Sequence, residues 1–282
     1  MKLFSRNTRK DGGGEMSFIE HLEELRGHLF KSAVAIAIGA VIVAYYNTFI
    51  FKKILMGPAH PDFPTYTFLC NLGQRLGLGA KLCMGGLTVK MQSNTVAGQF
   101  GVYFNVILLG GFILAFPYVF WQFWKFFRPA LTPKELKNTR GVIFWVSFLF
   151  FMGVLFGYFV IAPYTISFFS KFKLDDNIDN LWTISSYFGT LVPLILGAAL
   201  AFQLPLVLYF LARAGVVSSA FLKRSRKYAI VIMLVISGII TPPDMISQIV
   251  CCVPLLILYE VGVILTKRVE KREKLEEAAE WS

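Results

Sequence analysis

The stretch NLWTISSYFGTLVPLILGAALAFQLPLVLYFLA, residues 180–212, runs for 33 positions without a charged side chain. About 20 apolar residues in a helix cross the ~30 Å hydrocarbon core of a bilayer, so this stretch is long enough to span a membrane. Five more charge-free runs lie at residues 32–51, 91–124, 141–170, 228–243 and 245–259. The last run resumes after Glu260 and continues to Thr266. The sequence therefore predicts an all-α, polytopic membrane protein with six transmembrane helices.

The composition excludes a soluble globular protein. Of the 282 residues, 56% are hydrophobic and 16% are charged, and the mean hydropathy is +0.60, whereas a soluble domain carries roughly a quarter of charged residues. The net charge of +11 would suit a nucleic-acid binder, but the cations cluster between the spans. The lipid bilayer, and not nucleic acid, is therefore the expected surrounding.

The loop charges predict the orientation, because Lys and Arg beside a span stay on the cytoplasmic side. Of the 28 cations, 21 fall in the N-terminal segment, the second and fourth loops and the tail, and seven fall in the first and third loops. Both termini are therefore expected in the cytoplasm. We expect one membrane domain over residues 1–282, with 1–16 as a flexible cytoplasmic start. Residues 267–282 form a charged cytoplasmic tail, either a solvated helix or disordered.

Prolines within the spans predict bends. Each removes one helical hydrogen bond, and they stand at Pro117, Pro163, Pro193, Pro205 and Pro254. A bundle bent so often is expected to be concave. The fifth span, about 13 residues over 228–240, would reach only about 20 Å, so it is too short to cross alone.

Two cysteines, Cys70 and Cys83, lie in the long first loop. The predicted topology puts this loop outside the cytoplasm, where a disulfide can persist. A disulfide and two unpaired thiols both remain open. Cys251 and Cys252 lie inside the last span and are expected to pack as small apolar residues.

The segment before the first span predicts an amphipathic helix. An apolar stripe with helical spacing runs through Phe18, Leu22, Leu25 and Leu29. Ser17 and Glu20 form a capping box that fixes its start. The polar face, which includes Glu24 and Arg26, has two interpretations. It is a solvated surface with local pairing, or it holds a carboxylate for an incoming cation, since the anionic leaflet repels acidic residues.

Two later segments repeat the capping pattern. Thr132, followed by Pro133 and Glu135, predicts one helix start, and Thr241 with Asp244 predicts that of the last helix. A capping Glu135 still keeps one oxygen for a ligand.

Among the polar residues within the spans, Gln203, Gln248 and Glu260 stand out. Polar groups at that depth are costly unless paired, so each is a candidate for contact within the bundle or with a partner helix. Because Glu260 stands near a helix end, it could also reach the lipid headgroups.

Four motifs occur in order along the chain: HLEELR (21–26), FFRPAL (126–131) with Glu135, TPPD (241–244) with Gln248, and YEVG (259–262). Together they make the chain resemble the TatC family, the receptor subunits of the twin-arginine protein translocase. Two features depart from that pattern. Gln203 stands where many relatives carry a glutamate, and the first loop is longer than in the simplest relatives.

The resemblance implies a function in the bacterial cytoplasmic (inner) membrane. Folded proteins with a Ser/Thr-Arg-Arg-x-Phe-Leu-Lys signal would be recognised at the cytoplasmic face, with Glu24 and Glu135 holding the guanidinium groups and Arg26 and Phe126 beside them. Single-span partners of the TatA and TatB kind, a homo-oligomeric complex and transport driven by the proton motive force are also implied.

Two other classes of function fit the sequence less well. An enzyme is not expected, because the three histidines, His21, His28 and His60, all lie outside the spans and no H-E-x-x-H motif occurs. No cofactor or metal ligand set is predicted. A small-solute or ion transporter could line a path with Gln203 and Glu260, but transporters usually place paired charges or broken helices at mid-membrane. Here the acidic residues of interest lie at the cytoplasmic edge.

Overall fold

The structure, a computed structural model, describes residues 18–77, 83, 91–127, 141–173, 175, 180–242 and 245–280. The helices are α1 (Phe18–Tyr45), α2 (Asn47–Phe49), η1 (Ile50–Leu55), η2 (Gly57–Ala59), α3 (Pro64–Arg75), α4 (Gly98–Phe127), α6 (Val142–Phe156), η5 (Gly157–Ile161), α7 (Ala162–Lys171), α8 (Ile184–Ala201), α9 (Leu204–Arg213), α10 (Ser219–Arg224), α11 (Arg226–Ile240) and α12 (Met245–Glu280). Two short strands, β1 (Met91–Gln92) and β2 (Trp182–Thr183), pair in parallel.

The all-α membrane fold is confirmed. Within the described residues, five helical stretches are long and apolar enough to cross a membrane: Leu22–Tyr45, Gly98–Phe126, Val142–Lys171, Ile184–Arg213 and Met245–Arg272. The sixth helix, α11, has 15 residues, or about 22 Å, and packs along α12. Its shortness agrees with the prediction from the sequence.

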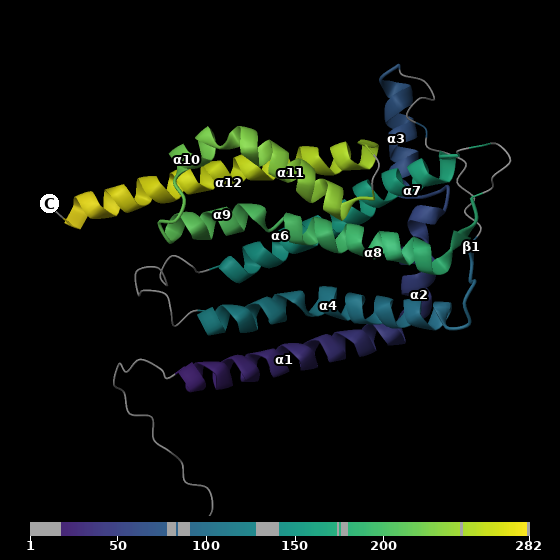
Figure 1. Cartoon of the computed structure of the whole chain (residues 1–282), viewed down its shortest axis with the longest axis horizontal. Coiled ribbons are helices and arrows are strands. Elements are labelled where there is room, and N and C mark those ends of the chain that lie inside the picture. Colours follow the sequence, from purple (N-terminus) through teal and green to yellow (C-terminus); the bar gives the residue numbers. More distant parts are fainter. Residues whose placement is uncertain are drawn as a thin grey trace, which may run out of the picture.

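The helices form a row (Figure 1). At one edge α1 packs on α4, which packs on α6 and α8, and at the other edge α9 and α11 pack on α12. The first residues of α1, the last of α4, and α10 lie at one end of the bundle, called here the α10 end. The opposite end, called the α3 end, carries α3 and the two strands.

Two of the prolines mark breaks. Before Pro163 the helix widens into the π-helical turn η5, and Pro205 lies in the first turn of α9, after the α8 helix has ended at Ala201. A proline cannot supply the N–H that its helix requires. An apolar hollow of about 460 Å³ lies between α1, η1, α4, α6, η5 and α8.

Glycines allow α1 and α4 to cross at close range. A Cβ added to Gly39 would lie 2.6 Å from the carbonyl oxygen of Gly111, and one added to Gly111 would lie 2.5 Å from the backbone nitrogen of Ala40. Small residues at such crossings are how membrane helices gain van der Waals contact.

Tyrosines fix the first loop to the bundle at the α3 end. The hydroxyl hydrogen of Tyr66 is shared between the carbonyls of Pro58 and Pro163, at 2.8 and 3.3 Å, and Tyr187 donates to the carbonyl of Leu55 at 2.7 Å. Burial raises the pKa of Tyr66, so its hydroxyl remains a donor at any physiological pH. The segment from η1 to α3 is therefore held as part of the bundle.

The structure joins Cys70 and Cys83 by a disulfide, with the two Cα atoms 4.2 Å apart and a sequence separation of 13. Of the two alternatives left open by the sequence, it is the disulfide that forms. Cys251 and Cys252 are free and buried, as expected.

We expect removal of this disulfide to weaken the α3 end. Closing a loop of about 15 residues contributes roughly 3 kcal/mol in the chain-entropy account. The variant Cys70→Ser/Cys83→Ser should therefore melt at a lower temperature than the unmodified chain in detergent, and dithiothreitol should lower the melting temperature of the unmodified chain alone. An equal response of both proteins to the reductant would contradict this expectation.

Candidate functional site

The N-terminal turns of α1 lie against the last turns of α4 at the α10 end (Figure 1). The segment that the apolar stripe predicts to be helical is a helix, and it forms one continuous helix, α1, with the first span. Across the contact, Nδ1 of His28 lies 2.7 Å from Oε1 of Gln122. Gln122 is 3% exposed, so the interaction is enclosed between the two helices.

Glu24 is one helical turn before His28. Its side chain is 38% exposed, and its Oε1 lies 4.0 Å from Nε2 of His28. Among the described residues, no Lys or Arg is ion-paired with Glu24. The carboxylate is thus anchored on a packed helix but open to an incoming cation.

The other residues predicted for this site are placed only in part. Arg26 is exposed on α1, and Phe126 is partly exposed near the end of α4. Glu135 lies outside the described residues, so its distance from Glu24 stays a prediction. The expected caps Ser17, Thr132 and Asp244 also lie outside the described residues.

The prediction for Thr241 was wrong. Thr241 was expected to start the last helix, but it is the C-terminal cap of α11, where its Oγ1 donates to the carbonyl of Ser237 at 2.8 Å. The next helix, α12, begins only at Met245. A threonine hydroxyl can bond to the carbonyl four residues earlier as readily as it can cap a following helix, and here the first of these bonds forms.

Gln203 and Gln248 make contacts within the bundle. Gln203 lies in the break between α8 and α9, and its Nε2 donates to the carbonyls of Val146 and Ala199 at 3.3 and 3.5 Å. Its Oε1 is buried and has no hydrogen-bond partner among the described residues. Gln248 on α12 donates from Nε2 to the carbonyl of Leu234 on α11, at 3.0 Å.

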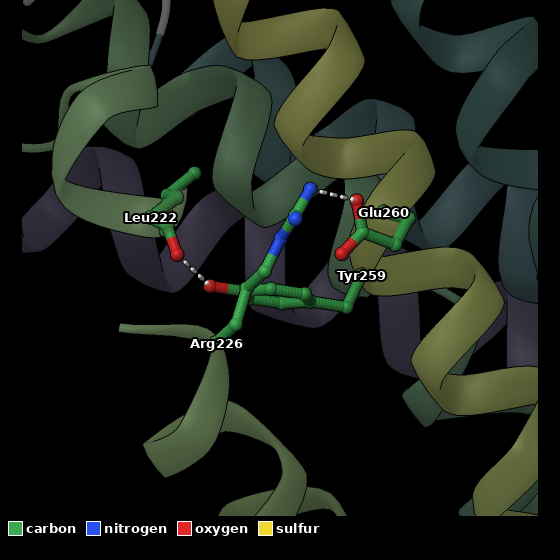
Figure 2. A network of polar contacts seen from close by, with 4 residues as sticks. All are labelled: Leu222, Arg226, Tyr259 and Glu260. Atoms are coloured by element: carbon green, nitrogen blue, oxygen red, sulfur yellow. Dashed lines mark hydrogen bonds and ion pairs between the residues drawn. The ribbon is translucent and has the colours of Figure 1, made fainter. Parts of the chain in front are cut away.

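Glu260 is ion-paired within the chain (Figure 2). Nη2 of Arg226, at the start of α11, lies 2.8 Å from Oε2 of Glu260 on α12, and both side chains are about half exposed. The neighbouring Tyr259 donates to the carbonyl of Leu222 on α10, at 2.8 Å. The two contacts hold α10 and the start of α11 against α12.

A third contact ties α10 to the charged tail. Oε1 of Glu270 accepts the backbone N–H of Ser219 at 2.6 Å, and Oε2 accepts the Ser219 hydroxyl. The tail is helical, because α12 continues without interruption to Glu280. This decides between the two alternatives left by the sequence, a helix or a disordered segment.

Sequence reasoning missed three partners: Gln122, Arg226 and Ser219. The one local signal concerned His28 itself, which follows Glu24 by four residues and so shares its helix face. The partners themselves are 94, 34 and 51 residues distant in the chain.

Bent membrane-crossing helices with acidic and aromatic residues at one end define a multi-pass membrane protein. Residues 20–254 match the family described as "Sec-independent protein translocase protein (TatC)", and the chain belongs to this family. The role of that family in protein translocation is not an enzymatic one, and it replaces the alternative of a small-solute or ion transporter.

Relatives and solved structures agree with this assignment. The chain is 39% identical to the TatC protein of Blattabacterium sp. subsp. Periplaneta americana, over 94% of this chain and all of that one. It is 32% identical to TatCy of Bacillus subtilis, over 94% of each. A crystal structure of the twin-arginine translocase receptor TatC superposes with a TM-score of 0.67 at 30% identity, covering 89% of this chain and 99% of that one.

Proposed function

We propose that this chain is the receptor subunit of a twin-arginine translocase, and that it binds the signal peptides of folded proteins at the α10 end of the bundle. The observation that carries the proposal is the half-exposed carboxylate of Glu24, fixed where α1 packs on α4 and not paired with a Lys or Arg of the described residues. A guanidinium is planar, permanently charged and bidentate toward a carboxylate, so a pair of arginines suits a pair of such acids.

Glu135 is the second acid of the proposed site. It follows the FFRPAL motif that begins at Phe126, at the end of the helix on which α1 packs. Phe126 is proposed to supply apolar contact to the signal peptide, and Arg26 to orient the neighbouring acidic face of α1.

The α10 end is proposed to face the cytoplasm of a bacterial cell, with the bundle in the inner membrane and both termini cytoplasmic. The excess of Lys and Arg in the segments at that end supports this orientation. Residues 1–282 are proposed to act as one membrane domain.

Single-span subunits of the TatA and TatB kind are the proposed partners, in a complex that contains several copies of this chain and exports cargo with the proton motive force. Gln203, Gln248 and Glu260 are the proposed helix contacts. Gln203 is partly exposed in the break between α8 and α9, and its amide is proposed to turn toward a neighbouring helix there.

Photocrosslinking tests the recognition step. A photoreactive residue at Gly27 would stand one turn from Glu24, where an added side chain meets nothing within 4 Å. A second probe would replace Leu136, beside Glu135. We expect a peptide with Arg-Arg to crosslink at both positions about tenfold more than its Lys-Lys version, because ammonium offers no bidentate contact.

Gly189 provides the matched control position. It also has open space around an added side chain, but it lies on α8 near the α3 end. Neither peptide should crosslink there. Equal crosslinking of the Arg-Arg and Lys-Lys peptides at position 27 would remove the recognition proposal.

A further inference from the structure

His28 connects the candidate site to the packed core of the bundle. Its ring is 14% exposed, with one nitrogen 2.7 Å from the oxygen of Gln122 and the other 4.0 Å from the carboxylate of Glu24. The backbone carbonyl of His28 also accepts the hydroxyl of Ser32 at 2.9 Å. The ring therefore has a fixed position between an uncharged anchor and an exposed acid.

The anchor determines which nitrogen carries the hydrogen. The amide oxygen of Gln122 can only accept, so Nδ1 of His28 donates to it. In the neutral ring, Nε2 then presents a lone pair toward Glu24. In the protonated ring, Nε2 carries a hydrogen and the positive charge stands beside the carboxylate.

We propose that His28 is a positioning residue whose charge controls how freely Glu24 can bind an arginine of the signal peptide. The neutral imidazole leaves the carboxylate available to the guanidinium. The imidazolium holds the carboxylate as an ion pair and competes with the peptide. This inference rests on the proposed function of Glu24 and adds regulation by pH to it.

One other group on α1 can change charge in the same range: His21, which precedes Glu24 by three residues. Lys31 follows His28 by one turn on α1. On α4 the charged side chain is Lys125, whose ammonium lies 3.7 Å from the centre of the Trp121 ring. Histidine is the side chain that ordinarily changes charge between about pH 5 and 8, so a midpoint in that range would be assigned to an imidazole, and the variant His28→Gln decides whether that imidazole is His28 or His21.

Binding of the proton and of the peptide must then oppose each other. If protonation of His28 weakens peptide binding by some factor, peptide binding weakens protonation by the same factor. The two compete because the imidazolium of His28 and the guanidinium of the peptide arginine bind the oxygens of the same carboxylate, that of Glu24.

The test measures the affinity of the full-length chain in detergent for a dye-labelled Arg-Arg signal peptide by fluorescence anisotropy. We expect the dissociation constant to rise about three- to tenfold between about pH 8 and pH 5.5. In the variant His28→Gln the dissociation constant should stay level over this range. A parallel rise in His28→Gln, or a level profile in the unmodified chain, would overturn the inference.

His60→Gln is the matched control. His60 is exposed beside η2, at the α3 end, so this variant should retain the full pH dependence of the unmodified chain. If instead the profile becomes level in His60→Gln and not in His28→Gln, the inference is overturned.

Gln122→Glu tests the anchor independently. A carboxylate in place of the amide favours the imidazolium, so the midpoint of the profile should move upward by about one pH unit. An unchanged midpoint in a folded Gln122→Glu protein would contradict the inference. Failure of the proposed function looks different: the unmodified chain at about pH 8 would then bind Arg-Arg and Lys-Lys peptides equally.

Discussion

Replacing Glu24 by arginine should abolish the binding of twin-arginine peptides and the export of folded cargo. The substitution removes the acceptor of a guanidinium and puts a like charge in its place. For a half-exposed carboxylate we expect a loss of about 2–3 kcal/mol in binding free energy, or roughly 30- to 150-fold in affinity. Anisotropy with a labelled peptide gives the affinity, and the amount of a folded reporter outside the cytoplasm gives the export.

Glu23→Arg is the control for this prediction. Glu23 precedes Glu24, is exposed on the same helix, and changes the net charge by the same amount when substituted. It points to a different side of α1, because successive residues of a helix lie about 100° apart. Affinity in Glu23→Arg should fall by no more than about threefold, as for a screened surface charge. Comparable losses in the two variants would mean that only the overall charge of α1 matters.

Replacing Gly111 by leucine should separate α1 from α4 and so disrupt the candidate site around Glu24, which depends on their contact. Even a single added carbon at this position would lie 2.5 Å from the backbone nitrogen of Ala40 and 2.8 Å from the carbonyl oxygen of Ile36. Backbone atoms cannot move aside as a flexible side chain can. We expect a loss of about 3 kcal/mol or more, at the upper end of overpacking effects, visible as a lower melting temperature in detergent.

Gly101→Leu is the comparison for that measurement. Gly101 lies on the same helix, α4, and an added Cβ there meets nothing within 4 Å. Its replacement should leave the melting temperature unchanged or raise it, since glycine disfavours a helix by about 1 kcal/mol relative to alanine. If Gly111→Leu and Gly101→Leu melted alike, the close crossing of α1 and α4 would not contribute to stability.

Much of the fold follows from the sequence because a bilayer imposes length and polarity on each span. The charge-free run at 180–212 predicts the stretch formed by α8 and α9, and Pro205 accounts for the break between them. The shortness of α11 follows from the Thr-Pro-Pro sequence at its end. These features depend on residues that are close in the chain, because the length of a charge-free run and the position of a proline determine where a helix begins and ends.

Contacts between helices could not be predicted in the same way. The pairing of Arg226 with Glu260 depends on the register of α11 against α12, and that of His28 with Gln122 on the crossing of α1 and α4. Neither register is contained in the spacing of the residues along one helix. Thr241 was misassigned for a related reason: the same hydroxyl can close one helix or begin the next.

The last helix, α12, has 36 residues and so a contour length of about 54 Å. Some 30 Å of this suffices to cross the hydrocarbon, and the bond from Ser219 to Glu270 braces the part beyond it. The part of α12 beyond the hydrocarbon is therefore a rigid helical extension. A dye attached at its tip would stay well clear of the lipid surface, and its energy transfer to labelled headgroups would report any tilt of the whole bundle.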